Sequence, residues 1–357
     1  MESVADDESG GTLRPVSGTP REVETALRGW LCAESEPEPE PEPLIIRTSG
    51  STGNPKDVLL SRRAVSASAH ATHARLGGPG QWLLDLPPQY VAGVQVIARS
   101  VLAGERPVVA AEHATLQDAI AAMDGRRRYA SLVPTQLHRL AEAGRLDVLA
   151  SLDAVLVGGA ALDPGLRARA DEAGVRVVRT YGMSETAGGC VYDGVPLDGV
   201  ALRIDVDGRV WLAGPVLFDG YDGDPSATAE VLHDGWLRTS DLGELDADGR
   251  LRVLGRTDDV VISGGVNIAL PRVSEALRRV DGVADAVAVG VPDPEWGRRV
   301  VAVVVGDVPL EALRDGVEAA GLPRTWAPRR ALCVDALPLL GHGKVDRQAV
   351  QALAADA

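Results

Sequence analysis

The feature that most constrains the fold of this chain is a regular alternation of short apolar runs and helical patterns between residues 44 and 182. The apolar runs predict strands at 44–48, 81–86, 108–110, 129–133, 154–159 and 175–182. The segments between them predict helices at 59–74, 94–102, 115–123 and 135–142. Strands that alternate with helices favour an α/β fold built from layered sheets.

The pattern changes after Val200. Asp-Gly pairs at 207–208, 234–235 and 248–249 are typical of tight turns, so this stretch predicts β-hairpins of a small β-rich lobe. Beyond Thr257 the pattern predicts a helix at 271–280, strands at 283–291 and 298–306, and a helix at 310–320. An αββα unit of about 100 residues has the size of a small independent α+β domain.

We therefore predict three regions: residues 1–43, 44–257 and 258–357. The first begins with a polar tail over residues 1–20, followed by a short helix at 21–31. An acid–proline tract at 34–43 follows, and we expect an extended spacer because its charges repel and proline is stiff. A binding tract for a basic partner is the alternative that this composition leaves open.

Charge and cysteine content exclude several classes of protein. The net charge is −15, and nucleic acids or anionic membranes bind basic surfaces, so we expect neither as a partner. No apolar run approaches the roughly 20 residues that span a bilayer, and the acidic N-terminus lacks a signal-peptide core. The three cysteines are widely spaced, which predicts reduced thiols in a cytoplasmic protein rather than disulfides or a zinc site.

Only two of the 36 basic residues are lysines, Lys56 and Lys344, and the others are arginines. Both lysines lie in Gly-containing segments, where a random distribution would rarely place them. Arginine has a wide planar head and cannot replace lysine where a compact point charge must enter a tight site. These segments are therefore the first candidates for chemistry.

The first candidate segment is TSGSTGNPK at 48–56, directly after an apolar run. Its glycines permit left-handed backbone, and the amides and hydroxyls of such a loop can form an anion nest. The spacing differs from the GxxxxGK[ST] pattern of P-loop proteins. A flexible polar turn is the alternative, and the terminal Pro-Lys pair favours phosphate binding instead.

The second candidate segment is YGMSE at 181–185, at the end of a predicted strand, where open parallel sheets bind ligands. Tyr181 offers a ring to stack on a purine. Ser184 offers a hydroxyl for phosphate, and Glu185 offers a hard oxygen for Mg²⁺. The alternative is an ordinary β–α loop in which Ser184 caps a helix.

Two further segments complete the set. Asp241 could accept hydrogen bonds from ribose hydroxyls, and Arg256 could help to hold ribose or phosphate; surface turns with solvated charges are the alternative. In PLLGHGKVDR at 338–347, two glycines precede Lys344. An ammonium group there can neutralise charge on an attacking carboxylate and an α-phosphate. A frayed tail is the alternative.

In this order and at these distances, the four segments resemble the signature motifs of the adenylate-forming enzymes. This superfamily includes acyl-CoA synthetases, luciferases and peptide-synthetase adenylation domains. The resemblance runs from about Leu44 to Arg347. It implies ATP, Mg²⁺ and coenzyme A as the small molecules used. It also implies a large ATP- and acid-binding domain at 44–257 and a small mobile domain at 258–357 that carries the catalytic lysine.

By this resemblance, the loop at 48–56 would wrap the β- and γ-phosphates, and residues 158–160 would line the adenine, with Tyr181 stacked on it. Asp241 and Arg256 would hold the ribose. The implied ATP-binding residues are Thr48, Ser49, Gly50, Ser51, Thr52, Gly53, Lys56, Gly158, Gly159, Ala160, Tyr181, Gly182, Met183, Asp241 and Arg256.

The resemblance also implies the catalytic groups. Lys344 would catalyse adenylation, Ser184 would touch the α-phosphate, and Glu185 would hold the metal ion. Asp258 would lie at the hinge about which the small domain rotates between the two half-reactions. Gly264 and Gly265 would lie on the loop that then approaches the pantetheine arm of coenzyme A.

Three further stretches, at 86–100, 131–137 and 188–200, look like those of o-succinylbenzoate–CoA ligases of menaquinone biosynthesis. Asp57, the Gln89-Tyr90 pair and Ser240 depart from the wider family's pattern, and Asp57 places an acid near the expected phosphates. A diacid such as o-succinylbenzoate needs a polar or basic anchor for its second carboxylate. Ser131, Thr135 and Tyr90 are candidates for the acid pocket, and a strand residue and a helix N-cap are the alternatives for the first two.

Other functions stay open from the sequence. Another aryl- or acyl-acid–CoA ligase, or an adenylation enzyme that loads a carrier protein, would carry the same four segments. A non-catalytic nucleotide-binding relative is the alternative from another class, although Lys344, Glu185 and Asp241 together favour an enzyme.

Overall fold

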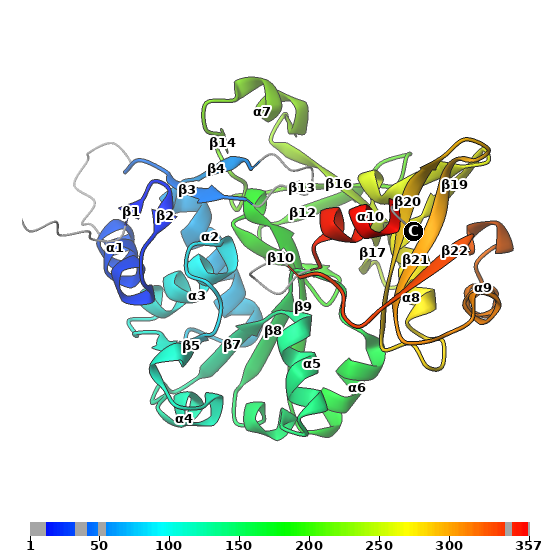
Figure 1. Cartoon of the computed structure of the whole chain (residues 1–357). Coiled ribbons are helices and arrows are strands. Elements are labelled where there is room, and N and C mark those ends of the chain that lie inside the picture. Colours follow the sequence, from blue (N-terminus) through cyan, green and yellow to red (C-terminus); the bar gives the residue numbers. More distant parts are fainter. Residues whose placement is uncertain (1–11, 33–40, 49–54, 340–344, 356–357) are drawn as a thin grey trace, which may run out of the picture. The chain divides into compact units, whose positions relative to one another are not determined.

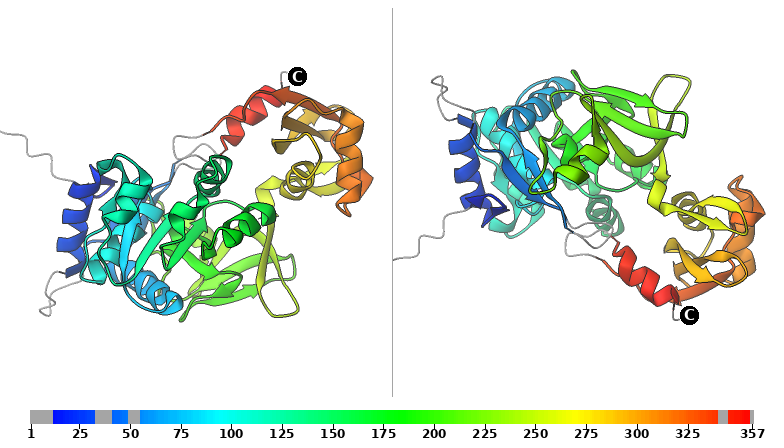
Figure 2. Two further views of the ribbon diagram at one scale, coloured as in Figure 1. Left: turned by 90° about the horizontal axis from the view of Figure 1, so that it is seen from below. Right: turned by 90° about the horizontal axis from the view of Figure 1, so that it is seen from above.

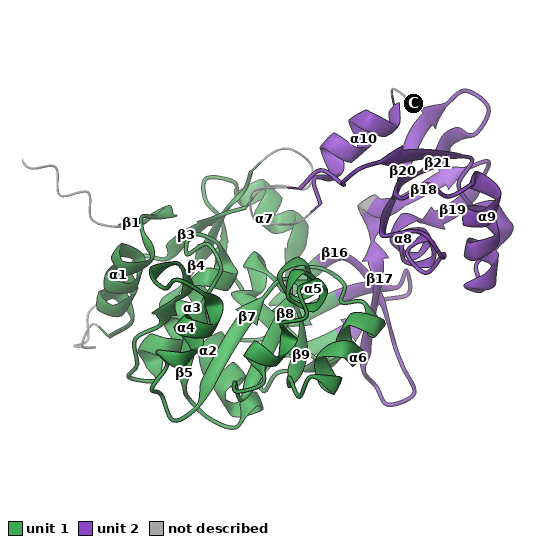
Figure 3. Cartoon of the chain, turned by 60° about the horizontal axis from the view of Figure 1, so that its bottom comes forward, with its two compact units in different colours: residues 1–202, 211–238 green, residues 203–210, 239–357 purple. Residues whose placement is uncertain are grey.

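The computed structural model describes residues 12–32, 41–48, 55–339 and 345–355, without the side chain of Asp258. It divides into two compact units, shown in different colours in Figure 3. Unit 1 comprises residues 1–202 and 211–238, and unit 2 comprises residues 203–210 and 239–357. The domain boundary predicted between residues 257 and 258 was based on an expected hinge motion. It stays a prediction.

A seven-stranded sheet forms the centre of unit 1, with the strand order β11-β10-β9-β8-β7-β5-β6. The five strands β5 to β9 pair in parallel, and β10 and β11 add an antiparallel edge. The strands are β5 (Gln81–Leu84), β6 (Val108–Val109), β7 (Arg128–Leu132), β8 (Ala154–Gly158), β9 (Val177–Met183), β10 (Gly188–Tyr192) and β11 (Val195–Pro196).

Helices cover both faces of this sheet, which confirms the predicted layered α/β fold (Figure 1, Figure 2). Alternating strand residues serve opposite faces: Leu156 and Val178 pack with α2 and α3, whereas Val155 and Val177 pack with α4, α5 and α6. The helices of unit 1 are α1 (Pro20–Cys32), α2 (Arg62–Leu76), α3 (Val91–Leu102), α4 (Leu116–Ala121), α5 (Pro134–Glu142), α6 (Pro164–Glu172) and α7 (Pro225–Val231).

A second, three-stranded sheet of unit 1 has the order β14-β4-β3. Strand β3 (Leu44–Arg47) pairs with β4 (Asp57–Leu60), which pairs in turn with β14 (Gly220–Tyr221). The predicted helix at 59–74 is therefore wrong at its start. Val58 and Leu60 are buried in sheet pairing, and the helix begins only after Ser61, whose side chain accepts a hydrogen bond from the amide of Ala64.

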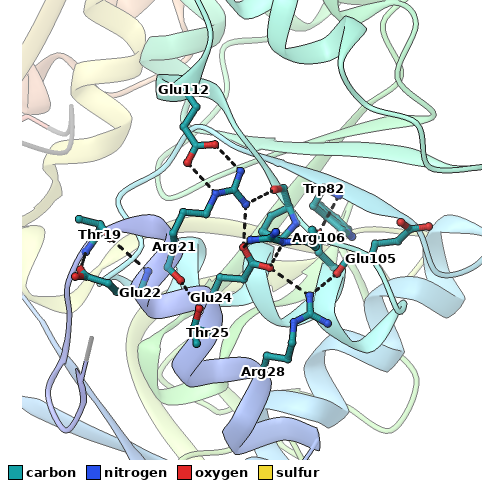
Figure 4. Close-up of polar contacts among 12 residues, drawn as sticks. Thr19, Arg21, Glu22, Glu24, Thr25, Arg28, Trp82, Glu105, Arg106 and Glu112 are labelled. Carbon is teal, nitrogen blue, oxygen red and sulfur yellow. Dashed lines mark hydrogen bonds and ion pairs between the residues drawn. The ribbon is translucent and has the colours of Figure 1, made fainter. Parts of the chain in front are cut away.

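Helix α1 confirms the helix predicted at 21–31 and is fixed by a charge cluster (Figure 4). Glu24 is only 2% exposed. Its carboxylate pairs with Arg21 at 2.9 Å, Arg28 at 3.3 Å and Arg106 at 2.9 Å. Before the helix, β1 (Thr12–Leu13) and β2 (Val16–Ser17) form a hairpin, so the predicted tail over 1–20 is wrong for these residues. Residues 1–11 and 33–40, including most of the acid–proline tract, lie outside the described residues.

The predicted β-rich stretch after residue 200 is confirmed as a five-stranded sheet through which the division between the units passes. Its strands are β12 (Ala201–Ile204), β13 (Arg209–Ala213), β15 (Leu232–His233), β16 (Trp236–Leu245) and β17 (Leu251–Arg256). The three Asp-Gly pairs lie in the turns between neighbouring strands, as predicted.

The C-terminal part of unit 2 contains a sheet with the order β19-β18-β21-β20 and with β22 beside β21. Helices α8 and α9 pack on one face and α10 on the other. The predicted αββα pattern is incomplete, because it lacks the hairpin β18–β19, strand β22 and helix α10. The elements are β18 (Val260–Ser263), β19 (Val266–Ala269), α8 (Leu270–Leu277), β20 (Asp285–Asp293), β21 (Gly297–Val305), α9 (Leu310–Ala319), β22 (Arg330–Val334) and α10 (Arg347–Ala355). Across the described ranges, no helix is both long and apolar enough to cross a bilayer.

Candidate active site

The two ends of the first glycine-rich segment are joined at Thr48 and Lys56. The amide of Thr48 donates to the carbonyl of Lys56 at 2.8 Å, and the amide of Lys56 donates to the Thr48 hydroxyl at 3.1 Å. The segment is therefore a loop whose two ends are hydrogen-bonded to each other at the end of the β3–β4 hairpin. Ser49, Gly50, Ser51, Thr52 and Gly53 lie outside the described residues, and their phosphate-binding roles stay predictions.

Asp57, the acid beside this loop, is paired with Arg47 across the same hairpin. Two hydrogen bonds of 2.9 and 2.8 Å join the guanidinium to both carboxylate oxygens. Hydrogen bonding to Arg47 lowers the pKa of Asp57 below its ordinary value, so the pair carries no net charge at neutral pH. Asp57 therefore adds less negative potential near the loop than its sequence position indicates.

The ends of the parallel strands β8 and β9 lie side by side next to the predicted adenine site. Gly158, at the end of β8, lies opposite Thr180 of the neighbouring parallel strand β9, one residue before Tyr181. A Cβ atom on Gly158 would lie 2.2 Å from the Thr180 hydroxyl, so only glycine fits. Gly159 has φ 84°, which favours glycine, and both Gly159 and Ala160 are exposed. Their adenine-binding roles stay predictions.

The YGMSE segment turns back on itself instead of entering an α-helix. Ser184–Thr186 form a single 3₁₀ turn, after which β10 pairs antiparallel with β9. The Thr186 hydroxyl accepts a hydrogen bond from the amide of Met183 at 2.9 Å and donates to the carbonyl of Gly188 at 2.7 Å. A Cβ atom on Gly182 would lie 2.1 Å from that carbonyl oxygen. The helix-cap alternative for Ser184 is therefore wrong.

Glu185 is held by a residue that the sequence did not single out, Tyr221 of β14. The phenol of Tyr221 donates to Oε1 of Glu185 at 2.8 Å, and the amide of Phe218 donates to the Glu185 carbonyl at 2.9 Å. The Nζ atom of Lys56 lies 4.3 Å from the centroid of the same tyrosine ring. The sequence held a signal for this contact, because aromatic residues are rare in the chain. Phe218 is its only phenylalanine and Tyr221 is one of five tyrosines.

The surroundings of Glu185 fit a magnesium ion. Mg²⁺ is usually bound by one or two carboxylates together with substrate phosphates and water, rather than by a cage of protein ligands. No group of three or more metal-binding side chains occurs in the part of the chain that the structure describes. Tyr221 engages Oε1 of Glu185, which leaves the hard oxygen Oε2 for the ion.

An open depression lined by residues of β14 and α7 is a poor nucleotide site. Asp219 and Asp224 are among its lining residues, together with Pro225 and Thr228 of α7. These two carboxylates would repel the phosphates of a nucleotide bound there. The Lys56–Tyr221–Glu185 cluster is therefore the better candidate in unit 1.

In unit 2, the structure brings Asp241 and Arg256 together. They are register partners on β16 and β17, and their side chains lie 4.0 Å apart. The hydroxyl of Thr257 donates to the Ser240 carbonyl at 3.2 Å, so the departure at Ser240 leaves this strand pairing intact. A carboxylate and a guanidinium side by side can together bind ribose hydroxyls and a nearby phosphate.

The predicted hinge and coenzyme A residues lie in turns of unit 2. Thr257–Asp259 form a 3₁₀ turn between β17 and β18, and the side chain of Asp258 lies outside the described residues. Gly264 and Gly265 form the β18–β19 turn with φ values of 56° and 81°. A Cβ atom on Gly264 would lie 2.6 Å from the Trp296 ring. The hinge and coenzyme A roles stay predictions.

The second lysine-bearing segment is also closed at its base. Leu339 and Val345 form an antiparallel bridge, and the amide of Asp346 donates to the Pro338 carbonyl at 2.9 Å. Beyond it, α10 buries Val350 completely, so the frayed-tail alternative is wrong for residues 345–355. Lys344 itself lies outside the described residues, and its catalytic role stays a prediction.

Comparison with known proteins identifies this arrangement. The family model described as "AMP-binding enzyme" matches residues 5–222, and the model described as "AMP-binding enzyme C-terminal domain" matches residues 272–344. The chain belongs to the AMP-binding enzyme family. It is 46% identical over 320 residues to a Mycobacterium tuberculosis protein named "Probable 2-succinylbenzoate--CoA ligase", covering 86% of this chain and 83% of that one.

Solved structures of AMP-binding enzymes have the same fold. That of o-succinylbenzoate CoA synthetase from Bacillus subtilis with its acyl-adenylate intermediate is 28% identical, with a TM-score of 0.76, over 86% of this chain and 68% of that chain. The same synthetase in complex with ATP and magnesium ion is 28% identical, with a TM-score of 0.74, over 85% of this chain and 68% of that chain.

The acid-pocket residues expected in this AMP-binding enzyme lie on three different elements. Ser131 is buried in β7, Thr135 is the second residue of α5, and Tyr90 is the N-cap of α3 without a capping side-chain hydrogen bond. Their contribution to an acid pocket stays a prediction.

Arg99 of α3 is a candidate for acid binding that the sequence analysis missed. It is 3% exposed and packs on Trp82, with its guanidinium carbon 4.8 Å from that ring. Its NH2 group lies 3.4 Å from the Tyr192 hydroxyl, and its Nε has no hydrogen-bond partner in the structure. Burial, and then the charge of Arg99, lower the pKa of nearby His73 to about 4, so that the imidazole stays neutral.

Proposed function

We propose that this protein is an AMP-forming acid–CoA ligase that converts 2-succinylbenzoate into its coenzyme A thioester. ATP first activates a carboxylate as an acyl-adenylate with release of pyrophosphate, and the thiol of coenzyme A then displaces AMP. The observation that carries the proposal is the convergence of Lys56 and Glu185 on Tyr221 within an AMP-binding enzyme fold. The names of the similar proteins support the choice of acid.

The physical problem in the first step is that two anions must meet. A carboxylate is a poor electrophile because it is negatively charged and its oxygen leaves badly, and attack on the α-phosphate turns that oxygen into part of AMP. Lys56 and the amides of the 48–56 loop would hold the β- and γ-phosphates, and Ser184 would orient the α-phosphate. Mg²⁺, when bound at Glu185, supplies charge compensation to the phosphate oxygens.

Unit 2 would contribute the remaining groups of the first step. Asp241 and Arg256 would fix the ribose, and Lys344 would place its ammonium at the attacking carboxylate and the α-phosphate. Lys344 must then withdraw to admit coenzyme A, so we expect a rotation about Asp258 that carries Gly264 and Gly265 to the pantetheine arm.

Arg99 would bind the second carboxylate of the diacid. A buried guanidinium without an acidic partner is costly, and a bound carboxylate would offset that cost with charge-assisted hydrogen bonds. Gly188, three residues after Glu185, lies against Gln95 of α3, one helical turn before Arg99. This face of α3 therefore continues from the neighbourhood of Glu185 to Arg99.

The deciding experiment is AMP and thioester formation with ATP, Mg²⁺, 2-succinylbenzoate and coenzyme A. We expect AMP release that requires the acid, and a thioester that requires coenzyme A. Acid-dependent ATP–pyrophosphate exchange with other acids but not with 2-succinylbenzoate would contradict the choice of substrate. Adenylate formation without thioester formation would favour an enzyme that loads a carrier protein, and no exchange with any acid would favour a non-catalytic relative.

A further inference from the structure

Tyr221 contacts both charged groups of the proposed ATP–magnesium site. Its hydroxyl donates to Glu185 at 2.8 Å, and its ring face lies 4.3 Å from the Lys56 ammonium. Lys56 and Glu185 are 129 residues apart in sequence, and one side chain from a third segment meets both. Neither Lys56 nor Glu185 has an ion-pair partner among the described residues, and both contact the same tyrosine.

The position of Tyr221 is set by contacts on every side. It is 8% exposed, and its backbone pairs with Val58 of β4, two residues beyond Lys56. Its amide donates to the Thr228 hydroxyl at 2.9 Å, and its ring packs edge-on against Phe218 at 5.0 Å between centroids. Gly220, the residue before Tyr221, has φ 144°, a value that only glycine adopts readily. The backbone conformation at Tyr221 therefore depends on this glycine.

The tyrosine hydroxyl donates to Oε1 of Glu185 at 2.8 Å. This hydrogen bond restricts the rotation of the carboxylate about its last bond. Hydrogen bonds from such outer partners orient metal ligands, and their loss typically costs about 10–100-fold in metal affinity.

We propose that Tyr221 is a positioning residue for magnesium-bound ATP, which holds Oε2 of Glu185 toward the ion while its ring keeps Lys56 apart from that carboxylate. The inference rests on the proposed function, because it needs Glu185 to bind the metal. Both charges then remain available for Mg²⁺ and the phosphates instead of neutralising each other.

The test is Tyr221→Phe, which keeps the ring under Lys56 and removes the donor to Glu185. ATP binding is measured by calorimetry on the full chain, with Mg²⁺ and with EDTA. We expect the Kd for ATP in the presence of Mg²⁺ to rise about tenfold, and the Kd in EDTA to change by less than about twofold. The Mg²⁺ concentration for half-maximal pyrophosphate release should rise about tenfold as well.

Tyr129→Phe is the matched control, since Tyr129 also donates one buried hydrogen bond, to the Gly78 carbonyl at 3.0 Å, away from these groups. It should leave the Mg²⁺ dependence unchanged. In a Glu185→Gln background, Tyr221→Phe should add little further loss, because the tyrosine acts through that carboxylate. If Tyr221→Phe does not fold, Tyr221→Met is the second variant. Because it removes the ring as well as the donor, it should weaken ATP binding in the presence of Mg²⁺ as Tyr221→Phe does and show a smaller additional loss in EDTA.

The outcomes separate this inference from the proposed function. Equal weakening of ATP binding with Mg²⁺ and with EDTA, or a full additional loss in the Glu185→Gln background, would overturn the positioning role alone. A parent protein that binds ATP no better with Mg²⁺ than with EDTA would overturn the proposed function and this inference with it.

Discussion

Asp241 and Arg256 face each other across the antiparallel strands β16 and β17, with a carboxylate oxygen of Asp241 4.0 Å from Nε of Arg256. Strand pairing fixes both Cα positions, so the two groups are presented together before any ligand binds. Pre-organised groups of this kind lose little conformational entropy on binding.

Asp241→Asn is therefore expected to weaken ATP binding. The amide keeps the shape of the carboxylate but loses its charge, and hydrogen bonds to charged groups are worth about 1.5–3 kcal/mol. We expect the KM for ATP to rise at least ~10-fold. Measuring the same KM with 2′-deoxy-ATP provides the control, because the substitution should matter less when a ribose hydroxyl is absent. An equal effect on both nucleotides would argue against ribose recognition.

Lys344→Ala should separate the two half-reactions. We expect adenylation to fall at least ~10²-fold, a typical loss when one charge-stabilising donor is removed. Thioester formation from preformed acyl-adenylate should be spared, because in the proposed mechanism Lys344 withdraws before coenzyme A attacks. Quenched assays of each half-reaction measure the two rates separately. A comparable loss in both steps would exclude the proposed role.

Arg99→Gln tests the anchor for the second carboxylate. We expect the KM for 2-succinylbenzoate to rise at least ~10-fold, since a charge-assisted hydrogen bond is lost. Turnover of a monocarboxylic analogue such as benzoate should change less than about threefold. The Tm of the free protein should stay level or rise, because the substitution removes a buried cation that has no acidic partner among the residues the structure describes. A clear fall in Tm with equal losses on both acids would instead indicate a structural arginine.

Glu24→Gln should destabilise unit 1 without touching the site. Three guanidiniums converge on this buried carboxylate (Figure 4). The arginines are partly exposed, so we expect a loss of about 2–3 kcal/mol, below the roughly 3–5 kcal/mol for breaking a fully buried pair. Glu142→Gln, which breaks an exposed single pair with Arg169, is the control and should lower the free energy of unfolding much less than Glu24→Gln.

The effect of Glu24 should also depend on pH. Burial disfavours its charged form, but hydrogen bonds from Arg106, Arg21 and Arg28 outweigh burial, and the pKa of Glu24 lies below its ordinary value of 4.5. A lowered pKa in the folded state stabilises the fold above the unfolded pKa, and this contribution is lost as pH falls through the folded value. The Tm difference between parent and Glu24→Gln should therefore be full at pH 7 and shrink below about pH 4.5. A difference that grows in acid would contradict this sign.

Local patterns explain which parts of the fold could be predicted. The layered sheet, the Asp-Gly hairpins and the helix at 21–31 depend on periodicity and turn chemistry within a few residues, and all three are confirmed. Strand β4 could not be recognised because its apolar residues run directly into α2, and only pairing with β3 and β14 makes it a strand. Helix α10 was missed because a short amphipathic stretch near the end of a chain becomes stable only by packing on β20 and β21.

The sequence by itself determined the order of the motifs, the two lysine-bearing segments, and the pairing of glycines with strand ends, because these are properties of neighbouring residues. The tertiary structure decided that Tyr221 links Lys56 to Glu185, that Arg47 neutralises Asp57, and that Arg99 is buried with no carboxylate beside it in the described part of the chain. These relationships join side chains from different strands and helices. A linear sequence does not specify such distances until burial of the apolar core brings the elements together.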